Sequence, residues 1–238
     1  MKRFLFTLLF LAWSSTASAA LAFVQQINDW VPSSGCNPSC TSVAFGSSPT
    51  TGNGMVGFVF FDSLSTTLSS VTSSTSNTWH LQCGPYDGEV ALGYRAYIIY
   101  AQNITGGASF TVTFNFSGTV NTLRYSVHEY SGGSTTAFFD NCSGASGLLS
   151  TTPNSGNFTQ TFTNEMLVGA GMATGITAGS GWSAPTGNNR LETANKSSTA
   201  LGTQSAPWTS SFTVWLAVGA GLKDATQPSA NRRRGGLF

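Results

Sequence analysis

Short segments in which apolar and polar residues alternate are the feature that most constrains how this chain can fold. Residues 110–116 read Phe-Thr-Val-Thr-Phe-Asn-Phe, and residues 123–130 alternate again after the turn Ser-Gly-Thr at 117–119. This period is typical of strands with one face in the core and one in solvent. We therefore predict a hairpin in which His128 lies on the solvent face. The expected core face carries Leu123, Tyr125, Val127 and Glu129.

Further segments of the same kind recur along the chain, separated by Gly, Pro, Asn and Ser. Residues 56–61 and 90–101 are rich in aromatic and β-branched residues, which predicts largely buried strands. Two segments built from small residues, 167–172 and 216–222, predict strands that another layer can approach closely. Roughly ten to thirteen short strands are expected, which favours an all-β chain folded as a single antiparallel two-sheet sandwich or jelly roll.

The first residues have the organisation of a cleavable secretory signal peptide. Lys2 and Arg3 precede an apolar run from Phe4 to Trp13, and small residues then lead to Ala19. The apolar run is shorter than the roughly 20 residues that a membrane-spanning helix needs. The prediction is a signal peptide at 1–19, a sandwich domain at 20–223 without a transmembrane segment, and a flexible basic tail at 224–238.

The chain has few charges, and this limits its partners. Only 8% of residues are Asp, Glu, Lys or Arg, and the formal net charge is +1; ordinary soluble domains carry about 25%. Nucleic-acid binding needs a concentrated basic face, whereas the only dense basic cluster here is residues 232–234 in the tail. Nucleic acid is therefore not an expected partner.

Four cysteines in an exported chain predict two disulfides, because secretory compartments are oxidising. Cys36 and Cys40 flank Asn-Pro-Ser in a short loop, which favours a bond between them and leaves Cys83 to pair with Cys142. Three pairings remain possible from sequence. A four-thiolate zinc site is the rival interpretation, but it usually has two closely spaced cysteine pairs. No metal and no cofactor are predicted.

Two runs also resemble a known group of proteins. They are Ala-Ser-Phe-Thr-Val-Thr-Phe at 108–114 and Leu-Arg-Tyr-Ser-Val-His-Glu-Tyr-Ser-Gly at 123–132, and they resemble a jelly-roll-like β-sandwich module of secreted environmental bacterial proteins. Asn-Glu-Met-Leu-Val-Gly at 164–169 is similar to a second motif of that group. The resemblance implies the fold and an extracellular location, but no assigned activity and no catalytic residue. Such modules often have Asp before an Asn-Thr-aromatic turn, where this chain has Ser76 before Asn77-Thr78-Trp79.

Catalytic chemistry has few candidate residues. No Gly-x-Ser-x-Gly sequence is present, which removes the usual nucleophile elbow. His80 and His128 are the only histidines that a Ser-His-Asp triad could use. Glycoside hydrolysis needs two carboxylates across a cleft, and Glu89 with Glu129 is the best-placed pair by sequence. The alternative is that these acids are solvated or form ordinary ion pairs with Arg95 and Arg124 on neighbouring strands.

Aromatic residues in polar, turn-rich surroundings are the candidates for ligand binding. A flat ring in a loop can stack on a sugar while neighbouring hydroxyls and amides bind its polar groups. The competing interpretation is that each ring covers the core. The candidates are Trp79, Tyr86, Trp182 and Trp208.

These observations favour a secreted, extracellular or cell-surface binding or adhesion module, with a polysaccharide or cell-surface glycan as its partner. One alternative is a secreted carbohydrate-active hydrolase that uses Glu89 and Glu129. Another is a self-assembling subunit of an extracellular filament or appendage, which an unpaired edge strand would favour.

Overall fold

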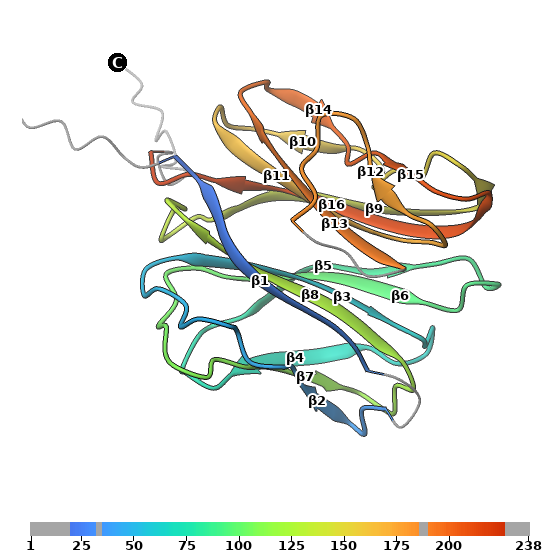
Figure 1. The fold of residues 1–238 in the computed structure, drawn as a ribbon, viewed down its shortest axis with the longest axis horizontal. Helices are drawn as coiled ribbons and strands as arrows, with labels where there is room; N and C mark the ends of the chain where they lie inside the picture. The colour runs from blue at the N-terminus through green and yellow to red at the C-terminus, as the bar shows by residue number, and fades with distance from the viewer. Residues whose placement is uncertain (1–19, 32–34, 186–189, 227–238) are drawn as a thin grey trace, which may run out of the picture.

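The computed structural model describes residues 20–31, 35–185 and 190–226, and these residues form 16 strands and no helix (Figure 1). The predicted all-β antiparallel sandwich is confirmed. The predicted signal peptide and most of the predicted tail lie outside the described residues. Asp224, where that tail was expected to begin, is buried, and its backbone pairs with Gly133. No helix in the described part of the chain has the length and apolar character needed to cross a membrane.

A five-stranded sheet lies at the centre of the molecule, with further sheets on both of its faces (Figure 1). Its middle strand, β3, is buried at all eight positions because each face has its own core. Met55, Val59 and Phe61 enter one core, and the intervening Phe58 and Phe60 enter the other. In spatial order the strands are β1 (Ala22–Val31), β8 (Leu123–Ser131), β3 (Gly54–Phe61), β6 (Arg95–Ala101) and β5 (His80–Asp87).

A three-stranded sheet covers one face of this central sheet. It consists of β2 (Ser39–Thr41), β7 (Val112–Phe116) and β4 (Leu68–Ser73). The predicted hairpin of β7 and β8 is therefore wrong. The two strands belong to different sheets and face each other across the core, where the rings of Phe114 and Tyr125 lie 5.1 Å apart. Alternation identified the buried face of β7 and one of the two buried faces of β8, but a buried face can meet another sheet as well as a neighbouring strand.

A four-stranded sheet covers the opposite face, which makes the second half of the sandwich. It contains β13 (Leu191–Ser198), β11 (Glu165–Met172), β16 (Thr213–Lys223) and β9 (Phe139–Ser150). Val168, Leu216 and Val218 from this sheet pack against Phe58 and Ile98 of the central sheet. The cores on the two sides of the central sheet account for the buried, near-continuous apolar runs at residues 56–61 and 95–101. Residues 88–94 form a turn, so the predicted strand at 90–101 begins only at Arg95.

The outer face of the four-stranded sheet is covered by short strands and loops. The covering strands are β10 (Phe158–Gln160), β14 (Gly202–Gln204), β12 (Thr177–Ala178) and β15 (Trp208–Thr209). The small residues of β11 and β16 allow this cover to approach closely, as predicted. Trp208 lies over Gly169 and Gly171, and a Cβ atom at Gly171 would be 2.5 Å from Ile176 Cδ1.

We expect Gly171→Ala to lower the free energy of unfolding by about 1–3 kcal/mol, because the added methyl group must displace Ile176 or Trp208. Gly46→Ala is the matched control, since no atom lies within 4 Å of a Cβ atom at that exposed glycine. Urea denaturation of both variants measures the difference. Equal stability of the two would show that the cover adapts without cost.

Candidate functional site

A cleft of about 170 Å³ opens at one end of the molecule, where the central and four-stranded sheets meet. The β5–β6 turn supplies Leu92 and Tyr94, β8 supplies Arg124, and Arg190 precedes β13. The end of β11 and the start of β16 complete the lining with Met172, Ala173, Thr174, Thr213 and Val214. No carboxylate is among the described lining residues, so the cleft combines apolar surface, hydroxyl groups and two guanidinium groups.

Trp30 extends this surface beside Arg124. The two residues are directly opposite each other on β1 and β8, so their side chains emerge on the same face of the sheet. The guanidinium carbon of Arg124 lies 4.8 Å from the centre of the Trp30 ring, and Trp30 as a residue remains 49% exposed. A guanidinium group over an aromatic face is a favourable cation–π arrangement that also restrains the ring. Trp30 was not among the residues selected from sequence, although Asn28 and Asp29 before it and Pro-Ser-Ser-Gly at 32–35 after it give it the same polar, turn-rich surroundings.

The four aromatic residues selected from sequence are mainly part of the cores. Trp79 and Trp208 are buried, and Trp79 Nε1 donates a hydrogen bond to Ser73 Oγ. Tyr86 is half-buried between the two sheets. Trp182 is also half-buried and packs on the outer core with Trp208. The structure therefore does not bring these four rings together on one surface.

The structure also keeps the two predicted catalytic carboxylates apart. Glu129 is near the end of β8 and pairs with Met55 of β3, which in turn pairs with Ala101 at the end of β6. Glu89 lies two residues after Asp87, which pairs with Arg95 at the start of β6. The seven residues of β6 lie between these levels, a distance of roughly 20 Å. Paired glycosidase carboxylates are about 5–10 Å apart.

Glu129 instead has a structural role as a buried hydrogen-bond acceptor. It is fully buried, and it accepts hydrogen bonds from Gln25 Nε2 at 2.6 Å, Thr50 N at 2.8 Å and Asn53 Nδ2 at 2.6 Å. These donors tie the loop before β3 to β1 and β8. The acid that pairs with Arg95 is Asp87, two residues before Glu89: its Oδ2 lies 2.9 Å from Arg95 Nη2.

His128 is completely buried, so the prediction that it faces solvent is wrong. Both faces of β8 are covered, and the face that sequence assigned to water lies against the four-stranded sheet. His128 Nε2 is 2.9 Å from Ser126 Oγ, and Nδ1 is 3.3 Å from Tyr130 Oη. Burial lowers the pKa of His128 to about 3, so the ring is neutral. This serine and histidine form a buried hydrogen-bonded pair that substrate cannot reach.

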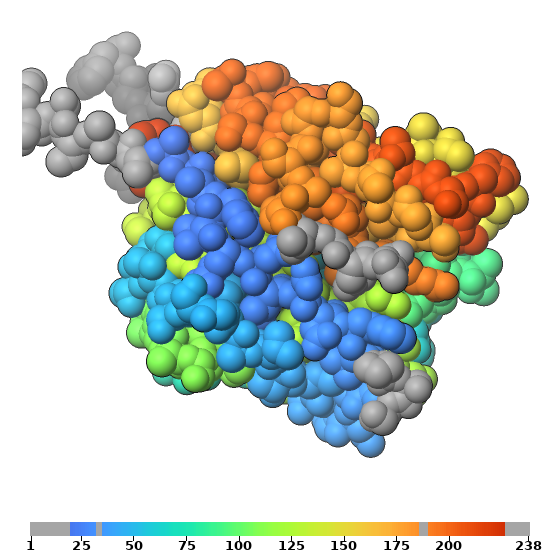
Figure 2. Space-filling view, viewed as in Figure 1, coloured from blue at the N-terminus to red at the C-terminus, as the bar shows by residue number. Residues whose placement is uncertain are grey.

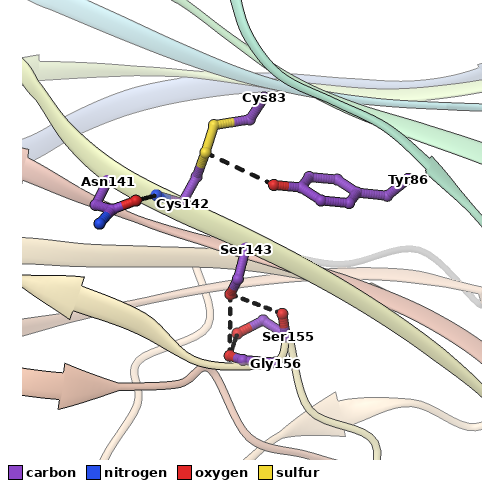
Figure 3. The surroundings of a disulfide bond; sticks show 7 residues. All are labelled: Cys83, Tyr86, Asn141, Cys142, Ser143, Ser155 and Gly156. Carbon is purple, nitrogen blue, oxygen red and sulfur yellow. Dashed lines mark hydrogen bonds between the residues drawn. A yellow bond between two sulfur atoms is a disulfide. The ribbon is translucent and has the colours of Figure 1, made fainter.

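The two disulfides pair as sequence favoured, Cys36 with Cys40 and Cys83 with Cys142. The second joins β5 of the central sheet to β9 of the four-stranded sheet (Figure 3). Tyr86 donates a hydrogen bond to Cys142 Sγ at 3.7 Å, while Ser143 Oγ donates to the carbonyl oxygens of Ser155 and Gly156 (Figure 3). Disulfides of this kind are typical of proteins that fold in oxidising compartments.

Within the described ranges, no group of three or more His, Cys, Asp or Glu side chains is placed to hold a metal ion. No protein-family model matches this sequence, and neither a curated protein nor a solved structure matches it.

Proposed function

We propose that this chain is an extracellular binding module that holds an acidic glycan in the cleft beside Trp30, Arg124 and Arg190. The observation that carries the proposal is the half-exposed Trp30 ring, which is stacked on Arg124 next to a concave surface. The two disulfides support an oxidising, extracellular location.

The chemistry of the cleft supports a sugar that bears carboxylate or sulfate groups. An aromatic face packs against the C–H face of a sugar ring, and guanidinium groups bind planar anions with two parallel hydrogen bonds. Thr174 and Thr213 add hydroxyl groups that can bond to sugar hydroxyls. The described lining has no carboxylate, so it supports binding rather than hydrolysis by an acid pair.

We expect Trp30→Ala to reduce retention on polygalacturonate or alginate at least about tenfold, because central aromatic anchors dominate such surfaces. Arg190→Ala should weaken retention and reduce its dependence on salt. Affinity electrophoresis with each polymer measures both effects, and neutral cellulose and xylan test the requirement for charge. Val24→Ser is the matched control, since Val24 is a similarly exposed residue of the same strand.

The alternatives predict different outcomes from the same samples. Soluble sugar product would replace the binding proposal with the hydrolase. Unchanged retention in Trp30→Ala would place the ligand elsewhere. Concentration-dependent light scattering without glycan would favour the filament subunit, for which β1 is the relevant element. β1 is the terminal strand of the central sheet, and Figure 2 shows it on the surface along much of its length.

A further inference from the structure

Three ionisable side chains meet on the outer face of the four-stranded sheet, although only 8% of the residues are Asp, Glu, Lys or Arg. They come from adjacent strands: Asp140 from the start of β9, Lys223 from the end of β16 and Glu165 from the start of β11 (Figure 1). Glu165 is directly opposite Lys223 in the ladder. A register shift leaves Asp140 and Asn141 opposite Gly221. The three side chains therefore share one small region that spans three strands.

Asp140 and Lys223 form a pair that is largely removed from solvent. Lys223 Nζ lies 3.6 Å from Asp140 Oδ1, with side-chain exposures of 11% for the lysine and 6% for the aspartate. The Phe162 ring covers Nζ at 4.6 Å. Thr161 holds the carboxylate in place, because its N–H donates to Oδ2 at 2.9 Å and its hydroxyl donates to Oδ1 at 2.6 Å. The amine and the carboxylate are thus held near each other and largely away from solvent.

Glu165 reaches this pair across the backbone of β16. A Cβ atom at Gly221 would collide with Glu165 Oε2 and would lie 3.6 Å from Asp140 Cβ, so only glycine leaves the path open. Glu165 Oε1 accepts a hydrogen bond from Phe162 N at 3.2 Å, whereas Oε2 is buried and receives no hydrogen bond. If Glu165 Oε2 carries a proton and donates it to Asp140, each of the two Glu165 oxygens has a hydrogen-bond partner.

The protonation of Glu165 follows from the same environment. Burial, followed by the hydrogen bond and the negative charge of Asp140, raises the pKa of Glu165 to about 9. Glu165 is therefore a neutral acid at physiological pH, placed against the carboxylate of a buried ammonium–carboxylate pair. Such a pair is costly to bury as two charges, and a reaction that converts it to an uncharged group removes that cost.

We propose that Lys223 and Asp140 join in an intramolecular amide bond, with Glu165 as the catalytic residue that transfers protons. Proton transfer from the ammonium to the carboxylate first gives a neutral amine and a neutral acid. The Nζ lone pair then attacks Asp140 Cγ. Glu165 donates a proton to the departing oxygen and recovers one from Nζ, so the C–O bond breaks and water leaves. Ammonium and carboxylate thus become amide and water, with no oxidant, metal or cofactor.

The fold supplies the driving force for this step. Holding the two groups in contact replaces a bimolecular encounter by an intramolecular one of high effective concentration. The new bond would join β9 to β16, the two strands that enclose β10 to β15 in the sequence. It would lock the four-stranded sheet covalently, which suits a module exposed to mechanical load or proteases.

Mass spectrometry of the intact full-length protein, purified folded and then denatured and reduced, tests the bond. We expect the wild type to be lighter than its processed sequence by one water molecule. Proteolysis should give a branched peptide that joins the segment containing Asp140 to the segment containing Lys223. Wild-type protein with no loss of water would overturn the proposal.

Three variants separate this bond from other dehydrations. Lys223→Arg should have no water loss, whereas a succinimide formed by Asp140 alone would persist in that variant and would also overturn the proposal. Glu165→Gln keeps the side-chain size and should fold without forming the bond. Lys196→Arg, at an exposed lysine of β13, should keep the water loss.

Discussion

Removing the Cys83–Cys142 disulfide by replacing both residues with alanine should lower the free energy of unfolding by about 4 kcal/mol. This bond joins positions 59 residues apart, whereas Cys36–Cys40 joins positions 4 apart. A cross-link stabilises mainly by restricting the unfolded chain, and the entropy that it removes grows with the logarithm of the loop length. The same relation gives only about 2 kcal/mol for the Cys36–Cys40 bond.

The positions of the two bonds add to this difference. Cys83 is buried in the core between the central and four-stranded sheets, so its bond fastens one sheet to the other. Cys36 and Cys40 close a loop beside the three-stranded sheet. Guanidinium denaturation of the two double-alanine variants measures the difference. Equal losses, or a larger loss at Cys36–Cys40, would contradict the loop-length argument.

The sequence predicted which segments become strands better than it predicted how they are arranged. Residues 110–116 have one buried face and one polar face, as alternation required, and β7 occupies most of that range. The partner of β7 was wrong because alternation shows that a face is buried but not what covers it. The three-stranded sheet adds a third layer and was not foreseen, since its strands β2 and β4 are short and polar on one side.

His128 shows the same limit at a single residue. A polar side chain in an alternating strand is normally assigned to solvent. In β8, however, that face lies against the four-stranded sheet, and Ser126 and Tyr130 supply hydrogen-bond partners within the same strand. Only the arrangement of layers reveals that this face is covered.

The candidate sites depend on contacts between distant segments, so sequence indicated them only weakly. Trp79 and Trp208 are in turn-rich surroundings but enter cores, because local composition does not determine which ring covers a sheet. Trp30 and Arg124 come together only through the pairing of β1 with β8. The cluster of Lys223, Asp140 and Glu165 had one usable signal in the sequence: a lysine at the end of a long apolar segment in a chain with few charges.

Opposite pH dependences of stability are expected from His128 and Glu165. The pKa of His128 is about 3 in the folded protein and 6.5 for an unperturbed side chain, so its contribution is present above pH 6.5 and is lost as the pH falls. The pKa of Glu165 is about 9 in the folded protein and 4.5 unperturbed, so its contribution is present at low pH and is lost as the pH rises. Each slope is at most about 1.4 kcal/mol per pH unit.

The two contributions to stability should therefore cancel between pH 4.5 and pH 6.5, the unperturbed pKa values of the two groups. From pH 6.5 up to about pH 9, only Glu165 should make stability depend on pH. Urea denaturation at a series of pH values measures each slope. In Glu165→Gln, stability should fall by about 2 kcal/mol between about pH 6 and pH 4.5, and should change little above neutrality. In His128→Gln, stability should rise steadily as the pH falls from about pH 9.

Burial is the largest cause of the raised pKa of Glu165, and it acts whether or not Lys223 and Asp140 are joined. Parallel pH profiles for wild type and both variants would show that neither group changes its proton affinity on folding.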